Sequence, residues 1–314
     1  MGIRINAVGP ACTIQDCGRH GYMDYGFQVS GAMDEKSLAI ANSLVGNSQD
    51  MAGIEITIGG LSATFTSDAV IAITGADIKP ELNKMPIPMY RAIYVKKDDV
   101  LECKFAKVGC RSYLAFNQGL ALKKIMGSLS TNIKCKIGGY LGRPLKANDL
   151  LFFNSTTPNI KNIDKHSINL SISFKNPVNI RVILGPQDDY FTESGINTFF
   201  TSTYQLTKDS DRMGIKLDGP VVESKNGVDI ISDGMPLGGV QIPSSGMPII
   251  MMSDRQTTGG YAKIATVIST DVQKLAQLRP NDSIRFENIC LEKAHKIYLN
   301  EKKYLMKVSK LWKQ

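Results

Sequence analysis

Two short polar runs in the last third of the chain combine side chains that could act together on a small ligand. Residues 210–214 read Ser-Asp-Arg-Met-Gly, and residues 254–261 read Asp-Arg-Gln-Thr-Thr-Gly-Gly-Tyr. A core strand has little use for such a mixture, because a buried charge without a partner costs several kcal/mol. The runs therefore indicate a site for a small polar ligand, and the arginines favour an anion.

The second run offers a role for each of its side chains. Arg255 could clamp a carboxylate or phosphate, while Asp254 could orient the ligand or move a proton. Thr257 and Thr258, with the two glycines that follow, could form an anion-binding nest. Lys263, two residues after Tyr261, would lie on the same face of the chain if a strand continues there. The alternative is a hairpin turn with an incidental ion pair.

Further candidates surround these residues in the sequence. Asp211 and Arg212 form an adjacent acid–base pair, which could be catalytic or a structural ion pair at a strand end. Gln241 could hydrogen-bond an amide or ureido group, although the glycines before it could equally serve close backbone packing. Gln256 and Tyr261 complete the predicted substrate contacts.

The N-terminal half contributes weaker candidates. Arg19 and Asp34 lie in glycine-punctuated loops and could bind substrate, but interface or helix-capping roles fit them as well. The segments 127–132 and 138–143 could cradle a phosphate. Glu55 lies in an apolar run, where a lone acid is either paired or functional, and pairing is favoured.

Several classes of site are not indicated. The sequence has no Walker A motif, no dinucleotide-binding glycine fingerprint, no nucleophile elbow and no biotin-attachment motif. Its six cysteines form no Cys-x-x-Cys pair and its three histidines lie far apart, so no metal site is predicted.

The net charge of +8 is concentrated at the C-terminus. Seven lysines and three glutamates follow from residue 287 onward, and apolar residues recur among them at helical spacing. This pattern predicts an amphipathic helix over 289–314 with its lysines in water. Neither nucleic-acid nor membrane binding is expected, since aromatic residues do not interleave with the basic ones and the apolar runs are short. No N-terminal apolar segment indicates export, so we expect a cytoplasmic protein.

Most of the remaining sequence is typical of a mainly β protein. Short β-branched runs predict strands at 69–74, 180–184, 249–252 and 265–269, whereas helices are expected only at 34–44, 187–200 and 271–278. A turn signal of Asn or Asp followed by Asp recurs before a strand at 97–101, 147–151 and 280–284, which hints at a repeated barrel module. We expect an N-terminal β-barrel subdomain over 1–155, a linker over 156–177 with one strand at 168–174, a second barrel over 178–288, and the tail helix.

A set of motifs along the chain resembles one family, the biotin-dependent carboxyltransferases also called allophanate hydrolase subunit 2. Its members include the C subunit of bacterial 5-oxoprolinases. The resemblance covers residues 3–287 in order and excludes the lysine-rich tail. It is carried by residues 13–19, 30–34, 41–47, 74–77, 127–131, 185–187, 210–214 and 254–261.

The resemblance implies a fold of tandem cyclophilin-like β-barrel subdomains. It implies, as function, the C subunit of an ATP-dependent 5-oxoprolinase that hydrolyses 5-oxoproline to glutamate together with an A subunit and a kinase-inhibitor-like B subunit. ATP, with magnesium, would act in that complex. One alternative is a carboxyltransferase component of a urea carboxylase or allophanate hydrolase system, where biotin would come through a partner. Another is a non-enzymatic regulator that binds a kinase inhibitor.

Overall fold

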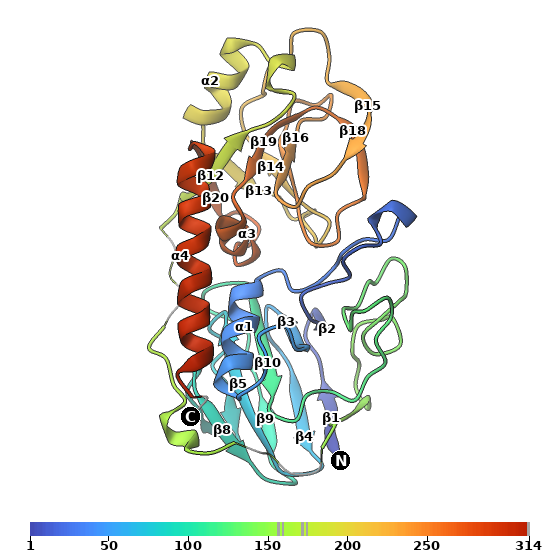
Figure 1. The fold of residues 1–314 in the computed structure, drawn as a ribbon, viewed down its shortest axis with the longest axis vertical. Helices are drawn as coiled ribbons and strands as arrows, with labels where there is room; N and C mark the ends of the chain where they lie inside the picture. Colours follow the sequence, from blue (N-terminus) through green and yellow to red (C-terminus); the bar gives the residue numbers. More distant parts are fainter. Residues whose placement is uncertain (156–157, 159, 171–172, 174, 313–314) are drawn as a thin grey trace. The chain divides into compact units, whose positions relative to one another are not determined.

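The chain divides into two compact units. The computed structural model describes residues 1–155, 158, 160–170, 173 and 175–312, with elements labelled as in Figure 1. Unit 1 comprises Met1–His20, Ser30–Ser173 and Lys303–Gln314, and unit 2 comprises Gly21–Val29 and Phe174–Lys302. Unlike the predicted division, residues 21–29 therefore belong with the C-terminal unit, and the tail helix is divided between both units.

Unit 1 places its strands in two antiparallel sheets. The six-stranded sheet has the order β11 (Leu150–Phe152), β1 (Gly2–Ala7), β4 (Ser62–Phe65), β9 (Val100–Glu102), β6 (Glu81–Leu82) and β7 (Met85–Pro86). The five-stranded sheet has the order β2 (Ala11–Gln15), β3 (Gly53–Thr57), β10 (Arg111–Phe116), β5 (Ala69–Gly75) and β8 (Ala92–Val95).

The core of unit 1 follows from the period-2 alternation of its central strands. Ala69, Ile71 and Ile73 of β5 join a cluster with Ile3 and Ile5 of β1, so the two sheets share one core. The other face of β5, with Val70 and Ala72, packs with α1 (Glu35–Leu44). Because both faces are covered, the strand is apolar at nearly every position.

Unit 2 is a closed barrel of seven strands. Their order is β12 (Val178–Leu184), β19 (Lys263–Val267), β16 (Gly239–Gln241), β17 (Ile249–Met251), β14 (Gly214–Asp218), β13 (Tyr204–Leu206) and β20 (Ser283–Asn288). The parallel pair β12–β20 closes the barrel, and the other pairs are antiparallel. A separate ribbon pairs β15 (Asp229–Gly234) with β18 (Thr258–Tyr261).

Helices in unit 2 pack on the barrel strands. In α2 (Glu193–Thr201), Phe199 is fully buried and stacks on Phe286 of β20 with ring centroids 4.2 Å apart. Burying a side chain of this size contributes about 1.5–3 kcal/mol. The helix α3 (Ser269–Ala276) follows β19 directly, and α4 (Leu291–Lys310) follows β20. Short 3-10 turns occupy Met23–Tyr25 and Asp188–Tyr190 in unit 2, and Ile163–Lys165 in unit 1.

The three turns with Asn or Asp followed by Asp share the same backbone conformation and the same hydrogen bond. Asp98, Asn148 and Asn281 adopt φ of 72°, 71° and 75°, a left-handed conformation that Asn and Asp tolerate. In each case the aspartate that follows accepts a hydrogen bond, at 2.7–2.8 Å, from the backbone N–H three residues earlier. The turns lead into β9, β11 and β20, so the module occurs twice in unit 1 and once in unit 2.

The prediction of a mainly β fold with few helices and an amphipathic C-terminal helix is confirmed. The helix predicted over 187–200 is shorter, because a 3-10 turn precedes it and Thr192 caps α2 by accepting the Gly195 N–H at 2.9 Å. The strand predicted at 168–174 falls partly on residues 171, 172 and 174, which lie outside the described residues, as do linker residues 156, 157 and 159 and tail residues 313 and 314. Residues 168–170 are not in a strand. Among the described residues, no helix is long and apolar enough to cross a membrane.

Candidate active site

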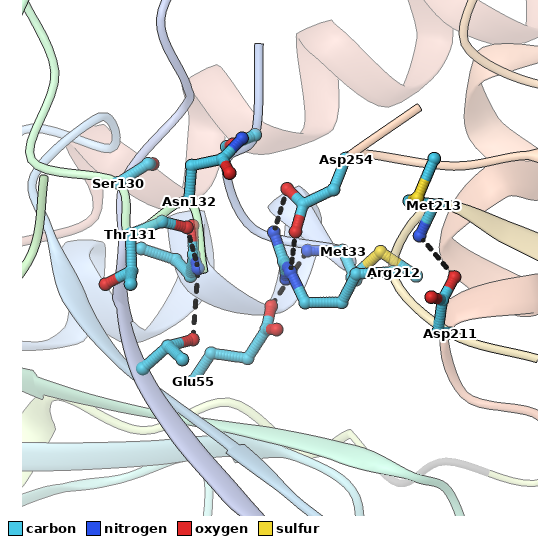
Figure 2. A network of polar contacts seen from close by, with 12 residues as sticks. Met33, Glu55, Ser130, Thr131, Asn132, Asp211, Arg212, Met213 and Asp254 are labelled. Atoms are coloured by element: carbon cyan, nitrogen blue, oxygen red, sulfur yellow. Dashed lines mark hydrogen bonds and ion pairs between the residues drawn. The ribbon is translucent and has the colours of Figure 1, made fainter. Parts of the chain in front are cut away.

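The two polar runs meet in unit 2, where Arg212 pairs with Asp254. Arg212 Nε donates to Asp254 Oδ2 at 2.8 Å and Nη2 donates to Oδ1 at 3.1 Å (Figure 2). The backbone N–H of Asp254 also donates to the Arg212 carbonyl at 2.8 Å. The two side chains are 14% and 8% exposed, so this two-point ion pair is mostly dehydrated. Arg212 therefore holds the Asp254 carboxylate in one orientation.

Asp211 differs from Asp254, because its hydrogen bonds among the described residues are to the backbone and not to an arginine side chain. Asp211 Oδ1 instead accepts the backbone N–H groups of Met213 at 2.7 Å and Gly214 at 3.1 Å, which shapes the turn into β14 (Figure 2). Adjacent side chains in an extended segment point to opposite sides, so sequence neighbours are poor candidates for a pair. A catalytic role for Asp211 stays a prediction.

Arg255 is a buried cation whose guanidinium contacts a backbone carbonyl. The residue is 8% exposed, and its Nε donates to the Met235 carbonyl at 2.8 Å. Within the described residues no acid pairs with this guanidinium. Burial alone lowers the pKa of Arg255 below its usual value. Such an arrangement costs stability unless an anion joins it, which favours a ligand carboxylate or phosphate at this position.

Two side-chain amides gather near Gly259 of β18. A Cβ on Gly259 would lie 3.3 Å from Gln241 Oε1 and 3.5 Å from Gln256 Nε2. Gln241 is 5% exposed, and its Oε1 is buried with no hydrogen-bond partner among the described residues. An orphaned buried acceptor is costly, so a ligand N–H donor fits it.

Lys263 also belongs to this region through its strand pairing. It lies opposite Gln241 in the β16–β19 pair, is 2% exposed, and its Nζ lies 2.8 Å from Asp233 Oδ2. The hydrogen bond from Lys263 lowers the pKa of Asp233. Gln187 Oε1 accepts the Lys263 N–H at 3.2 Å. Sequence reasoning did not name Asp233 or Gln187 as site residues. Gln187 lies in the motif at 185–187, whereas only the pairing of β15 with β18 brings Asp233 here.

The anion nest predicted at 257–260 is wrong. Thr258–Tyr261 is the extended strand β18, and neither of its glycines has the positive φ that a nest needs. Thr257 accepts the Met235 N–H through its carbonyl at 2.9 Å, while Thr258 pairs with Gly234 and Tyr261 pairs with Asp229. The chain then passes from β18 into β19, so Lys263 does not continue the strand that ends at Tyr261.

The predicted phosphate cradle in unit 1 is filled by the protein itself. The Asp16 carboxylate accepts the hydroxyls of Ser128 at 2.7 Å and Ser130 at 2.5 Å, and the Leu129 N–H at 2.6 Å. Arg19, fully buried, donates to the Ser130 carbonyl at 2.8 Å. The loop is thus built around a side-chain anion, and the phosphate interpretation of this loop is wrong.

Asp34 and Glu55 make structural contacts in unit 1. Asp34 caps α1 by accepting the Ser37 N–H at 3.0 Å and its hydroxyl at 2.6 Å. Glu55, 1% exposed, accepts the Met33 N–H at 2.8 Å (Figure 2) and the Tyr113 hydroxyl at 2.7 Å, so it is paired as favoured. Burial first, then the charge of Glu55, raises the pKa of Tyr113 well above its usual value. Substrate contacts by Arg19 and Asp34 stay predictions.

Comparison with known proteins identifies the family. The chain is 34% identical to the 5-oxoprolinase C subunit of Haemophilus influenzae over 98% of both chains, and 35% identical to the 5-oxoprolinase C subunit of Escherichia coli over 96% of both. It superimposes on the crystal structure of the K. lactis urea amidolyase with a TM-score of 0.90 at 29% identity, covering 98% of this chain and 20% of that one. The chain thus corresponds to about a fifth of the urea amidolyase. The profile described as "Carboxyltransferase domain, subdomain A and B" matches residues 25–288, and the chain belongs to this family.

Proposed function

We propose that this protein is the C subunit of a 5-oxoprolinase, a component of an enzyme that hydrolyses 5-oxoproline to glutamate. The single observation that carries the proposal is the identity of 34% to a 5-oxoprolinase C subunit over 98% of both chains. The polar groups of unit 2 are compatible with this substrate, which carries one carboxylate and one lactam.

In this proposal the polar side chains of the candidate site in unit 2 have the following roles. Arg255, to which the described part of the chain supplies no acidic partner, holds the substrate carboxylate, and the orphaned Oε1 of Gln241 accepts the lactam N–H. Asp254, oriented by Arg212, takes the proton of the water that attacks the lactam carbonyl carbon, and returns it to the lactam nitrogen as the C–N bond breaks. Lys263 stabilises negative charge as it develops on the lactam oxygen. Substrate contact is also assigned to Gln256 and Thr257, which precede β18, and to Thr258 and Tyr261, its first and last residues.

The cofactor and partners also belong to the proposal. We propose that ATP, with magnesium, activates the lactam in a cytoplasmic complex with the A and B subunits, and that the chain is inactive alone. No group of three metal-ligating side chains occurs among the residues described here. No step is therefore assigned to ATP on this chain.

The test is glutamate release from 5-oxoproline and ATP by this chain combined with its A and B subunits. Asp254→Asn and Arg255→Met should each lower kcat/KM by roughly 100-fold or more, because each removes a charged group from the reacting region. Arg285→Met, an exposed position of unit 2, is the matched control and should stay near the wild-type rate. Near-wild-type activity of both site variants would remove these residues from the mechanism.

One specific observation supports a second candidate, transfer of a carboxyl group to urea. The TM-score of 0.90 to the K. lactis urea amidolyase covers 98% of this chain. Biotin would then arrive on a partner protein. Urea-dependent loss of carboxyl groups from carboxybiotin, with no glutamate release from 5-oxoproline, would favour this candidate over the first.

A further inference from the structure

Three of the side chains assigned to the substrate in unit 2 are closed off from solvent. Lys263, Gln241 and Arg255 are all buried, and none of them is more than 8% exposed. A ligand cannot contact side chains as buried as these unless part of the protein next to them moves. The part most able to move should contact these groups and yet bury little surface of its own.

Residues 229–234, which we call the strap, meet both requirements. They form β15, which pairs with β18 in a separate two-stranded ribbon and is not a strand of the barrel (Figure 1). Five of the six strap residues are exposed, and Ile231 is 97% exposed. Val228 before the strap and Met235 after it are buried. The strap is therefore anchored at both ends and lies at the surface in between.

The pairing of the strap with β18 is irregular. Asp229 lies opposite Tyr261 and Asp233 opposite Gly259, so four steps along the strap match two steps along β18. The extra residues interrupt the ladder of hydrogen bonds between the two strands. At Gly234, the last residue of the strap, an added Cβ would meet no described atom within 4 Å, so close packing does not hold this residue. These features are typical of a segment with low local stability.

Asp233 fastens the strap to the barrel. Its Oδ2 accepts a hydrogen bond from Lys263 Nζ of β19 at 2.8 Å, and the side chain of Gln187 also donates to its carboxylate. The buried lysine needs a counter-charge, whereas the Asp233 side chain is 53% exposed and could turn to water if the strap moved. Directly after the strap, the Met235 carbonyl accepts from Arg255 Nε at 2.8 Å. The strap and its flank thus contact both buried cations of the candidate site.

We propose that the strap covers the candidate site, is fastened there by Asp233, and opens to admit the substrate. On opening, Lys263 would exchange the Asp233 carboxylate for the lactam oxygen, and Arg255 would exchange the Met235 carbonyl for the substrate carboxylate. Because each cation keeps a partner, opening costs less with substrate than without it. The identity of the ligand rests on the proposed function, whereas the fastening of the strap is a property of this chain alone.

The first test is amide hydrogen exchange of the full chain, followed by mass spectrometry of peptides that cover the strap. Asp233→Asn keeps the size of the side chain and removes its charge, so amides of 229–234 should exchange at least roughly 10-fold faster than in the wild type. Asp229→Asn is the matched control, because it makes the same change at an exposed residue of the same strand. It should leave exchange of the strap within about twofold of the wild type.

Two results of this test would overturn the proposal. Unchanged exchange in Asp233→Asn, or equal acceleration in both variants, would show that Asp233 does not fasten the strap. Acceleration that extends to β12 and β20 would show that the whole barrel loosens and that the strap does not open by itself.

The second test is steady-state kinetics of the complex reconstituted with the A and B subunits. If only the open form admits substrate, a larger open fraction in Asp233→Asn should lower KM for 5-oxoproline by roughly 3- to 10-fold, while Asp229→Asn keeps the wild-type KM. An unchanged or raised KM in Asp233→Asn would refute the role of the strap in substrate entry. Absence of activity from every complex would refute the proposed function instead, because hydrogen exchange needs neither substrate nor partner.

Discussion

The same substitution to methionine should lower the stability of the protein at Arg212 but leave it nearly unchanged at Arg255. In Arg212→Met, the Asp254 side chain, 8% exposed, loses a partner that holds both of its carboxylate oxygens. In Arg255→Met, no acid is left behind, because within the described residues none faces this guanidinium. The first variant should therefore be strongly destabilised, and the second should retain near-wild-type stability while losing activity.

The magnitudes follow from the contacts. Removing one partner of a mostly buried ion pair costs about 3–5 kcal/mol, which we take as about 3 kcal/mol for Arg212→Met because the arginine is 14% exposed. Arg255→Met loses a charged hydrogen bond to Met235, about 1.5–3 kcal/mol. It also relieves the dehydration of an unpaired cation, a term of several kcal/mol of opposite sign. The net change for Arg255→Met should lie within about 1 kcal/mol of zero.

Thermal and urea unfolding at neutral pH would measure the difference. About 3 kcal/mol corresponds to roughly 6–12 °C in Tm for a unit of this size, well beyond the scatter of such measurements. The exposed Arg285→Met variant supplies the baseline for replacing an arginine in unit 2. If Arg255→Met were destabilised as strongly as Arg212→Met, Arg255 would be a structural residue and its assignment to the substrate carboxylate would be refuted.

Three further predictions concern single groups. Arg181 and Lys274 hold the pKa of Asp271 below its usual value, against the effect of burial. The stability that Asp271 contributes is therefore present above about pH 4 and lost as the pH falls through its folded pKa. The difference in unfolding free energy between wild type and Asp271→Asn should be constant from pH 7 to about 5 and shrink below about 4; a constant difference down to pH 2 would contradict this. Asn281→Gly should leave Tm unchanged whereas Asn281→Val lowers stability by about 1–2 kcal/mol, because only the second resists a φ of 75°; equal Tm values would exclude this reason. Lys263→Met should lower kcat in the reconstituted complex by roughly 100-fold with a small change in KM, and a pure KM effect would make Lys263 a binding residue only.

Sequence patterns predicted the elements better than the contacts. The apolar run at 69–74 predicted β5, and the three turns of Asn or Asp followed by Asp predicted the strands that follow them, because both signals are local. The division of the chain into two units could not be predicted from local sequence in the same way. Residues 21–29 belong to unit 2 through contacts made far away in sequence, and no local propensity encodes them.

The candidate site shows the same limit. The sequence identified Arg212 and Asp254 as functional candidates, but their pairing joins residues 42 positions apart through β14 and β17. It assigned a nest to two glycines that the structure places in the extended strand β18, where Gly259 leaves room for the amides of Gln241 and Gln256. Asp233 had no sequence signal, because its contact with Lys263 depends on the pairing of β15 with β18.

The most direct test of the central claim is an omission series. Glutamate release from 5-oxoproline would be measured with ATP, the A and B subunits, and with or without this chain. The account predicts release only when all three proteins and ATP are present, and loss of that release with Arg255→Met. Release by the A and B subunits without this chain, or none from the complete set, would contradict the assignment of this protein as the C subunit.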